Sequence, residues 1–377
     1  MNLNSDHKRV LISPLDWGLG HATRLIPVID YLNSHNYRIL LGGSGKSATL
    51  LRKLYPDFDY VNLPSPGISY AKNPSFLVMK ILLQLPCLLF SIFWEHLLVN
   101  RICKKFQIDL IISDNRYGLF SGKAYSVIIT HQISPVLPDY LKWTEYLLYH
   151  TIKRMVEKFD ECWIPDFNNV KFNLTGKLSH RFKLPVNAFF IGLLSRFQNE
   201  PELFEEYHEY EKYDVVVIAS GPEPQLSLFI EYIISQADAI SYKVMLICAF
   251  AEKAFWKNPD RNKFLTIVPH LDQFTFKEIL KHAGLIICRS GYSTIMDLVT
   301  VGKKAVLVPT PNQPEQEYLS AYLSEKNIFY AVSQSDICLN SIYRNFEGKK
   351  NNNVLHLPIS ENQGFADRIK LYEANRK

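Results

Sequence analysis

The sequence lacks several features that mark large classes of protein. Its six cysteines form no C-x-x-C pair, and most of them stand in apolar runs. Buried, reduced thiols are the simplest account of this pattern, so we expect no disulfide framework and no cysteine metal site. The first residues are polar and lead directly into an apolar strand, so we expect no signal peptide. These absences favour a cytoplasmic protein.

Neither sign of charge dominates the chain. The formal net charge is +5, and the lysines and arginines are scattered along the sequence. A mild, dispersed positive charge argues against a nucleic-acid partner but is compatible with binding to an anionic membrane surface. No D-x-D carboxylate pair stands out in a metal-site setting, and the glycine-containing turn 42–45 lacks the Lys-Ser/Thr ending of a P-loop. We expect neither a metal nor a cofactor.

The chain is too long for one ordinary hydrophobic core. Domains usually hold about 100–200 residues, so a length of 377 residues predicts two domains. A hydrophobic share of 47% and a charged share of 21% are typical of a folded globular protein. In both halves short apolar runs alternate with helical patterns, which predicts an α/β fold with parallel sheets.

This alternation is clearest in the segment 285–317. An apolar run (285–288) leads into a Ser-Gly turn, a helical pattern (292–298) follows, and a second apolar run (305–309) comes next. The order is that of a parallel βαβ unit, in which ligands lie beyond the carboxyl ends of the strands.

The turn in this segment suits a phosphate group. Ser290 and Gly291 stand before the helix, and Tyr292 and Ser293 are its first residues. A helix N-terminus offers free N–H groups and a partial positive charge to an anion. Asp297 follows about two helical turns after Ser290, so it can project towards the same rim.

The first half repeats the order of strand, glycine-containing loop and helix. An apolar strand at 10–12 precedes the loop, and a helix is predicted from Ala22 to Ser34. The loop residues of interest are Asp16, Gly18, Gly20 and His21. A histidine here can take a proton from a hydroxyl near neutral pH, or it can simply cap the helix or pack under the loop.

Polar residues also follow two further strands of the first half. Asp114 and Arg116 come after the strand near 108–112, and His131 comes after the strand near 126–130. The carboxyl ends of parallel strands share one edge of a sheet, so these residues are candidates for an acceptor site or for holding His21 in one tautomer. Strand-end caps and loop hydrogen bonds would explain them as well.

The segment 285–317 resembles the donor-binding signature of the GT-B glycosyltransferases in the family of the peptidoglycan N-acetylglucosaminyltransferase MurG, glycosyltransferase family 28. The resemblance rests on Arg289-Ser290-Gly291 and on the spacing from Pro309 to Gln316. It implies two Rossmann-like domains with parallel sheets facing across a cleft, with the donor in the C-terminal domain and the acceptor in the N-terminal one.

The resemblance also implies roles for single residues. Ser290 and Gly291 would meet the nucleotide diphosphate, and Arg289 beside them would belong to the same donor site. Asp297 would hold the ribose hydroxyls, and Gln316 would contact the donor sugar. Asp297 stands where glutamate is commoner in the family, and Glu317 stands where a second glutamine is frequent. In the N-terminal loop, His21 matches a family histidine that faces the acceptor and the reacting carbon, with Asp16 and Asp114 as reserve bases.

Two other loops of the second half match family positions. Ser220 and Gly221 take the place of the first diphosphate loop, although prolines replace its usual glycines and remove N–H donors. Leu271 falls where backbone groups pair with the uracil edge, and His270 is placed to pack on the base or is a plain loop residue. The resemblance thus implies a UDP-sugar donor.

The predicted domain boundaries follow from this layout. We expect an acceptor-binding domain at 1–192, a linker at 193–212 and a nucleotide-sugar-binding domain at 213–360. The tail 361–377 reads as an amphipathic helix, which in GT-B proteins crosses back to the first domain.

The stretch from Phe76 to Trp94 is unusually apolar but is interrupted by Lys80, Gln84 and Pro86. A membrane span needs about 20 predominantly apolar residues, and this stretch is interrupted. Burial in the first domain or docking on a bilayer therefore explains it better than a full membrane span does. Aromatic and basic residues at 140–158 would suit the same interface. A peripheral position on the inner face of the plasma membrane would follow.

These observations predict a glycosyltransferase that moves a hexose or N-acetylhexosamine from a UDP-sugar to an acceptor hydroxyl. We expect an inverting, metal-independent reaction on a lipid-linked or cell-envelope glycan. Two alternatives stay open: a non-hydrolysing UDP-sugar 2-epimerase, and a catalytically silent sugar-nucleotide-binding protein. The sugar and the acceptor are not determined by the sequence.

Overall fold

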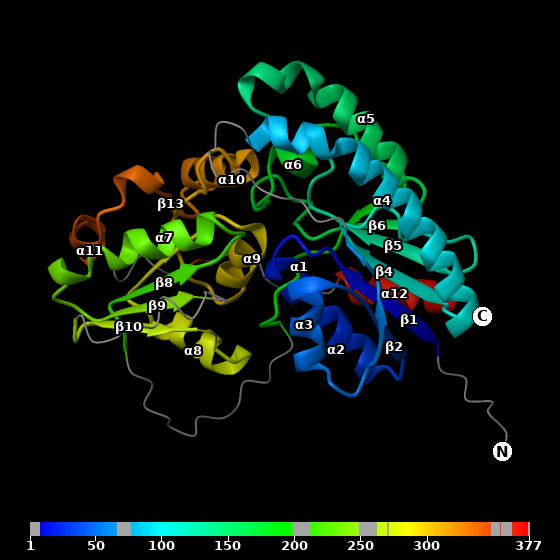
Figure 1. Cartoon of the computed structure of the whole chain (residues 1–377), viewed down its shortest axis with the longest axis horizontal. Helices are drawn as coiled ribbons and strands as arrows, with labels where there is room; N and C mark the ends of the chain where they lie inside the picture. The colour runs from blue at the N-terminus through cyan, green and yellow to red at the C-terminus, as the bar shows by residue number, and fades with distance from the viewer. Residues whose placement is uncertain are drawn as a thin grey trace. The chain divides into compact units, whose positions relative to one another are not determined.

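The computed structural model describes residues 8–65, 77–198, 212–248, 262–269, 271–347, 355 and 364–375, with the backbone alone for 77–82. The chain forms two compact units. The first contains Val78–Arg196, the strands that precede it and the C-terminal segment Pro358–Lys377. The second contains Phe197–Leu357. Each unit is a parallel sheet with helices packed on it (Figure 1).

The first unit is built on a seven-stranded sheet in the order β3-β2-β1-β4-β5-β6-β7, and every pair of neighbours is parallel. Its strands are β1 (Arg9–Pro14), β2 (Arg38–Gly43), β3 (Asp59–Asn62), β4 (Leu110–Asp114), β5 (Tyr125–Ile129), β6 (Glu161–Ile164) and β7 (Ala188–Phe190). The central strands β1, β4 and β5 are almost continuously apolar and buried, as expected for a parallel sheet that is covered on both faces.

Helices follow most of these strands. They are α1 (Leu19–Thr23), α2 (Ile26–Ser34), α3 (Gly45–Leu54), α4 (Leu77–Phe106), α5 (Glu145–Val156), α6 (Lys177–His180) and α12 (Gly364–Ala374), with a 3₁₀ helix η2 (Asp139–Thr144) before α5. Helices α4 and α5 pack on the same face of the sheet. Ile111 lies under α4 and pairs with Ser126, and Ile128, two residues further on the same face, lies under α5.

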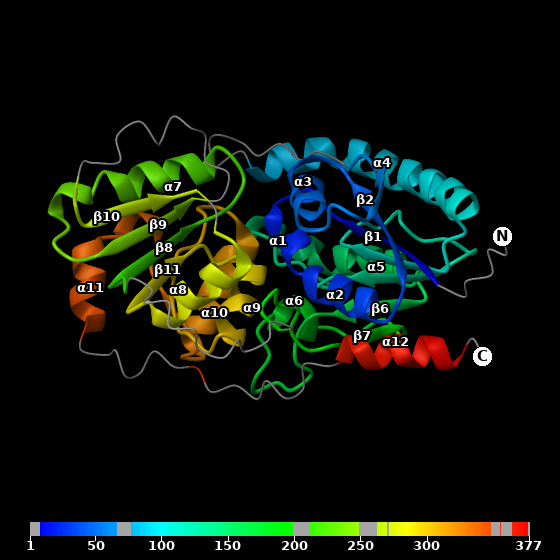
Figure 2. The same cartoon turned by 90° about the horizontal axis from the view of Figure 1, so that it is seen from below.

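The C-terminal helix α12 packs on the first unit. Arg368 donates a hydrogen bond to Glu161 of β6 at 3.0 Å, and Tyr37 donates one to Glu373 at 2.7 Å. Gly364 lies so close to the backbone of Ile191 that an added Cβ would meet its Cα at 2.7 Å. Figure 2 shows α12 in red beside β7. The chain therefore returns to the first unit after completing the second.

The second unit is built on a six-stranded sheet in the order β10-β9-β8-β11-β12-β13, which is again parallel throughout. Its strands are β8 (Val215–Ala219), β9 (Val244–Cys248), β10 (Leu265–Val268), β11 (Leu285–Cys288), β12 (Val306–Leu307) and β13 (Tyr330–Ala331). Its helices are α7 (Gln225–Ile234), α8 (Gln273–His282), α9 (Tyr292–Thr300), α10 (Pro314–Glu325) and α11 (Leu339–Glu347), with the 3₁₀ turns η3 (Ala237–Ala239) and η6 (Gln334–Asp336).

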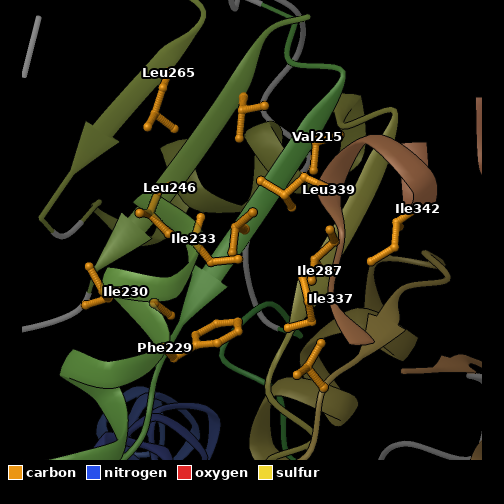
Figure 3. Close-up of a cluster of buried hydrophobic side chains, with 14 of the residues drawn as sticks. Val215, Phe229, Ile230, Ile233, Leu246, Leu265, Ile287, Ile337, Leu339 and Ile342 are labelled. Carbon is orange, nitrogen blue, oxygen red and sulfur yellow. The ribbon is translucent and has the colours of Figure 1, made fainter. Parts of the chain in front are cut away.

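The core of the second unit lies between its sheet and two helices. Phe229, Ile230 and Ile233 of α7 pack against the inward side chains of β8, β9 and β11 (Figure 3). Leu339 and Ile342 of α11 complete the same buried cluster. Helix α8 lies on the other side of these strands from α7 in Figure 1. The strands and helices around 285–309 confirm the predicted βαβ unit.

One predicted helix is wrong in its bounds. The segment expected to be helical from Ala22 to Ser34 forms two helices that are separated at Arg24 and Leu25. Pro27 stands in the first turn of α2 and has no N–H to donate to the carbonyl of Thr23, which disfavours one continuous helix and suits a helix start. The break leaves Arg24 with its side chain turned into the carboxyl edge of the sheet, where it meets Asp114.

Candidate functional site

Both sheets have the strand order of a doubly wound fold, in which the chain changes direction next to the first strand. The switch point lies between β1 and β4 in the first unit and between β8 and β11 in the second. Loops that leave neighbouring strands on opposite faces open a crevice at such a point, where ligands bind. Several predicted site residues follow the strands at these two places, namely those at 16–21, 114 and 116 in the first unit and those at 220–221 and 289–293 in the second.

In the first unit, His21 of α1 lies over the end of β4. Its Nδ1 is 3.1 Å from Oδ1 of Asp114 and 3.0 Å from Nη2 of Arg24. The guanidinium of Arg24 also binds both carboxylate oxygens of Asp114. Asp114 and Arg24 are buried, whereas the His21 side chain keeps 17% of its surface exposed. The three side chains form one hydrogen-bonded group with the imidazole at its outer end.

The position of the imidazole proton decides what this group can do. Nδ1 of His21 can accept a hydrogen bond from Nη2 of Arg24, which can only donate, or, when it carries a proton, it can donate one to Oδ1 of Asp114. With a proton on Nδ1, His21 donates to Asp114 and keeps a lone pair on Nε2. Nε2 makes no hydrogen bond to any residue that the structure describes. In this tautomer His21 can act as a general base.

Asp114 is suited to hold His21 rather than to act as a base itself. Burial alone would raise the pKa of this carboxyl, but the charges of Arg24 and His21 and their hydrogen bonds outweigh it and lower the pKa below its ordinary value. A fully buried carboxylate that stays ionised gives a fixed orientation to its partner. These contacts fit a role for Asp114 in holding His21 in one tautomer, which is one of the roles expected from the sequence.

Arg24 was missed by the sequence analysis. Its Nη1 is 3.1 Å from Nδ1 of His131, which must accept because arginine has no acceptor, so Arg24 links His131 to the His21–Asp114 pair. Two signals could have pointed to it. Arg24 is a charged residue within an apolar segment, and it stands three positions after His21, a spacing that brings side chains together on a helix.

The structure does not bring Asp16 to His21. Its Oδ1 accepts a hydrogen bond from the backbone N–H of Ser47 in the first turn of α3 at 2.9 Å. The carboxylate also lies over Gly45, whose φ of +63° and missing side chain leave room for it. Asp16 thus caps α3.

The loop before α1 is open at Gly18, which has a φ of +150° and no neighbouring atom within 4 Å of an added Cβ. Gly20 accepts the N–H of Arg24.

The guanidinium of Arg116 is occupied by contacts within the first unit. It is buried and binds Glu95 of α4 at 2.8 Å, Ser13 of β1 at 2.9 Å and the carbonyl of Pro64 at 2.6 Å. These contacts join α4 to the carboxyl ends of β1 and β3. Arg116 is a structural cross-link that has no donors left for a glycan hydroxyl.

In the second unit, the turn after β11 leads into α9 as predicted. Gly291 is the N-cap residue and has no side chain to cap the helix, and no atom lies within 4 Å of an added Cβ at this position. Ser290 is buried and donates its hydroxyl proton to the carbonyl of Gln316 at 2.8 Å. Helices α9 and α10 are thus tied together at an N-terminus that stands open to an anion.

Gln316 and Glu317 begin α10 and hold the loop that precedes it. Oε1 of Gln316 accepts the N–H of Thr310 at 2.9 Å, which fixes the orientation of the amide because a backbone N–H can only donate. Its NH₂ group faces the other way. Glu317 accepts the N–H of Asn312, whose φ is +58°, at 2.7 Å. Gln316 can therefore offer a hydrogen-bond donor to a ligand, and Glu317 an acceptor.

The turn after β8 is less open. Gly221 has a φ of +131° and open space around it, which fits a loop that approaches a ligand closely. However, Glu223 accepts the N–H of Ser227 at 3.3 Å and so places a carboxylate at the N-terminus of α7. An anionic ligand at Ser220 and Gly221 would have to displace this carboxylate, so the N-terminus of α9 is the better diphosphate site.

The remaining donor-side residues are placed as follows. Asp297 is buried within α9, together with Tyr292 at its start, and Ser293 follows Tyr292 in the first turn. Leu271 directly precedes Asp272, the N-cap residue of α8, beyond the end of β10. His270 lies outside the described residues. Within the described part of the chain, no group of three or more His, Cys, Asp or Glu side chains could hold a metal ion.

Comparison with known families identifies the second unit. Residues 224–356 match the model of the Glycosyltransferase family 28 C-terminal domain. The second unit is a family 28 glycosyltransferase domain. The resemblance inferred from 285–317 is confirmed by this match, which includes the turn at Ser290 and the start of α10.

Curated relatives of the family 28 domain share one name, UDP-N-acetylglucosamine--N-acetylmuramyl-(pentapeptide) pyrophosphoryl-undecaprenol N-acetylglucosamine transferase. The protein of Histophilus somni is 39% identical over 56 residues, which are 15% of this chain and 16% of the relative. That of Haemophilus influenzae is 30% identical over 78 residues, which are 20% of this chain and 22% of the relative. The matches thus span only about a fifth of these relatives.

Solved structures resemble the whole chain. The kitacinnamycin glycotransferase superposes with a TM-score of 0.64 at 11% identity and covers 97% of this chain and 99% of its own. Acinetobacter baumannii MurG superposes with a TM-score of 0.51 at 13% identity and covers 94% of this chain and 93% of its own. At such low identity the likeness establishes the fold alone. It confirms the predicted GT-B fold class, with two Rossmann-like units.

Proposed function

We propose that this protein is a glycosyltransferase that moves a hexose or N-acetylhexosamine from a UDP-sugar to an acceptor hydroxyl with inversion at the anomeric carbon. The observation that carries the proposal is the open N-terminus of α9, with Ser290 and Gly291 at the switch point of a family 28 domain. A second site, His21 over Asp114, stands at the switch point of the other sheet.

The leaving group of this reaction is a nucleoside diphosphate, whose oxygens gain negative charge as the bond to the sugar breaks. Backbone N–H groups and the helix dipole of α9 would stabilise that charge. A fixed set of dipoles can take this role without a metal, so we propose a metal-independent reaction. Gln316 would donate to a sugar oxygen and Glu317 would accept from a sugar hydroxyl, since their other atoms hold the backbone of the preceding loop.

The acceptor hydroxyl needs a base. In the proposed step its proton passes to Nε2 of His21 while its oxygen bonds to the anomeric carbon, and the electrons of the breaking bond leave with the diphosphate. Asp114 would keep the imidazole in the tautomer that has this lone pair, and would stabilise the imidazolium that forms.

We further propose that the acceptor is lipid-linked and that the first unit docks on a membrane. Within the described residues, the segment Leu83–Phe106 of α4 is long and apolar enough to cross a bilayer. Its later residues Val99 and Cys103 pack in the core of the first unit, however, so only the earlier part can enter lipid. Docking on the cytoplasmic face of the membrane accounts for both observations.

Exposed side chains on two helical segments support this docking. Phe90 and Phe93 of α4 keep 66% and 58% of their surface exposed, and Trp143 of η2 keeps 80%. Such large apolar side chains are rarely exposed together in a soluble monomer. Lys142, Lys153 and Arg154 in the same region as Trp143 would favour anionic lipid headgroups.

The test is a thermal-shift screen of UDP-, TDP- and GDP-sugars, followed by turnover assays in EDTA with membrane extracts as the source of acceptor. We expect a UDP-sugar to raise Tm, and UDP to be released only when extract is present. Sugar isomerisation without release of UDP would support the epimerase instead. Binding without turnover on any extract would support a silent binding protein, and stabilisation by no nucleotide sugar would refute the donor assignment.

A further inference from the structure

Arg289 carries a buried charge that has no acidic partner. The residue is 1% exposed, and its hydrogen bonds go to the carbonyls of Val308, Pro309 and Gln225 and to Oε1 of Gln334, at 3.4, 3.2, 3.4 and 2.7 Å. Its Nε makes no hydrogen bond to any of the residues that the structure describes. No Asp or Glu forms an ion pair with it in the part of the chain that the structure describes.

Such a charge is costly to bury. Buried arginines are normally paired with a carboxylate, because neutral acceptors replace only part of the lost hydration. The face of Phe229 lies 4.0 Å from the guanidinium carbon and contributes a weak cation–π attraction. Burial lowers the pKa of Arg289 to about 10, so the side chain is still charged at neutral pH. Within the part of the chain that the structure describes, this cation therefore has no counter-charge.

The charge lies beneath the proposed diphosphate site. Arg289 is the residue before Ser290 and Gly291, which lead into α9. Its contact with Gln225 reaches the first residue of α7, and its contact with Pro309 reaches the end of β12. One guanidinium thus joins the loops at the carboxyl ends of β8, β11 and β12, where the open N-terminus of α9 also attracts anions.

We propose that the counter-charge missing from Arg289 is the diphosphate of the bound nucleotide. Arg289 is a positioning residue: its charge strengthens the attraction for the diphosphate through the protein, and its hydrogen bonds hold the three loops that surround the ligand. This inference rests on the proposed function, because it needs a nucleoside diphosphate at α9.

The experiment compares the affinities of UDP and uridine by calorimetry, because uridine lacks the diphosphate. In Arg289→Met the buried charge is removed, and in Gln334→Glu a carboxylate is placed beside it. In both variants we expect UDP affinity to fall by about tenfold or more, or about 1.4 kcal/mol, while uridine affinity stays within about twofold. Arg289→Lys keeps the charge and should keep most of the preference for UDP.

Two control variants match these changes on the surface of the second unit. Arg344→Met removes the same charge from α11, and Asn327→Asp adds the same charge at an exposed position. Neither should alter the ratio of UDP to uridine affinity. Gln334→Glu should also raise the Tm of the free protein, because it supplies the absent partner of Arg289.

If Arg289 has only a structural role, Arg289→Met should weaken the binding of UDP and of uridine alike. That result overturns the proposal. Should Arg289→Met not fold, an unchanged UDP-to-uridine ratio in Gln334→Glu overturns it equally. Failure of the wild type to bind either ligand refutes the donor assignment instead, and so can be told apart from failure of this inference.

Discussion

In the proposed reaction, proton transfer would depend on how His21, Arg24 and Asp114 share their hydrogen bonds. If Nε2 of His21 is the base, His21→Ala should lower kcat by about 10²–10⁴ and leave UDP affinity unchanged, because the donor site is built by the other unit. Rates of UDP release and calorimetric titration with UDP would measure the two quantities. His282→Ala, at an exposed histidine of α8, is the control. Near-normal turnover in His21→Ala would exclude the base role.

Asp114 makes the stability of the first unit depend on pH. The pKa of its carboxyl is lower in the folded protein than the ordinary aspartate value of 3.8. The ionised carboxylate therefore stabilises the fold at pH values above 3.8. This stabilisation is lost as the pH falls through the pKa of the folded protein. Asp114→Asn should remove this part of the acid dependence. It should also destabilise the unit by about 3–5 kcal/mol at pH 7, because Arg24 is left buried without its partner.

Urea unfolding at several pH values below 5 and at pH 7 would check this prediction. Asp59→Asn is the matched control, since Asp59 forms an exposed ion pair with Arg38 and exposed pairs stabilise proteins little. An acid slope that is the same in the wild type and in Asp114→Asn would contradict it.

The sequence could place residues whose position depends on local structure, but it could not reveal contacts with partners that are distant in the chain. Ser290 and Gly291 precede a helix by their place in the chain, so the motif places them. Asp16 and Arg116 find their partners in Ser47 and Glu95, which are distant in the sequence. No sequence pattern near Asp16 or Arg116 indicates these contacts.

Among the elements, α4 has two halves with different environments. The docking proposal predicts that replacing Phe90, Phe93 and Trp143 by serine abolishes flotation with vesicles that contain phosphatidylglycerol, because these exposed side chains would supply the apolar area that enters lipid. Val186→Ser is the control, since Val186 is exposed away from both segments. Wild-type protein that stays with neither anionic nor neutral vesicles would refute the docking.

The second half of α4 is held by a close contact. A Cβ added at Gly118 would meet the carbonyl of Ile92 and lie 2.6 Å from the Cβ of Glu95. Gly118→Ala should therefore push α4 from the sheet and destabilise the first unit by about 1–3 kcal/mol, measured by urea unfolding. Gly122→Ala, in the same loop with open space around it, should have little effect. Equal effects of the two changes would show that chain flexibility, not packing, is responsible.

Apolar patterns predicted which helices and strands form better than they predicted the residues at which these begin and end. The strands at β1, β4, β8 and β11 follow from short apolar runs, because parallel strands are covered on both faces. The break between α1 and α2 was missed because apolar periodicity continues across Arg24 and Leu25. Likewise, hydropathy cannot tell that Val99 faces the protein core and Phe93 the solvent, since only the position of the sheet decides it.

At the scale of the whole molecule, the two sheets share one strand order over six strands, and the first sheet adds β7. The alternation of apolar runs predicted parallel α/β sheets in both halves, and the resemblance to a known family implied two Rossmann-like domains. The surface on which the C-terminal helix packs could not be predicted in the same way. Helix α12 follows the second unit in sequence but packs on the first, through contacts with β6 and with residues just before β2 and β4. Amphipathic character predicts such a helix, while the surface it covers is set by tertiary contacts.

Glu161 is the main anchor for this helix. It is buried and accepts hydrogen bonds from Tyr125 at 2.8 Å, Trp163 at 2.7 Å and Arg368 at 3.0 Å. Arg368→Met removes the cation and leaves a buried carboxylate with neutral donors only. Because Arg368 is partly exposed, we expect a loss of about 1–3 kcal/mol, below the cost of breaking a fully buried pair.

The loss should be confined to one unit. In differential scanning calorimetry of the whole chain, Arg368→Met should shift the unfolding of the first unit and leave that of the second, since α12 makes its hydrogen bonds within the first. Lys370→Met is the matched control, because Lys370 pairs with Asp367 in an exposed position on the same helix. A shift of both transitions by Arg368→Met would mean that the anchoring of α12 stabilises the two units together.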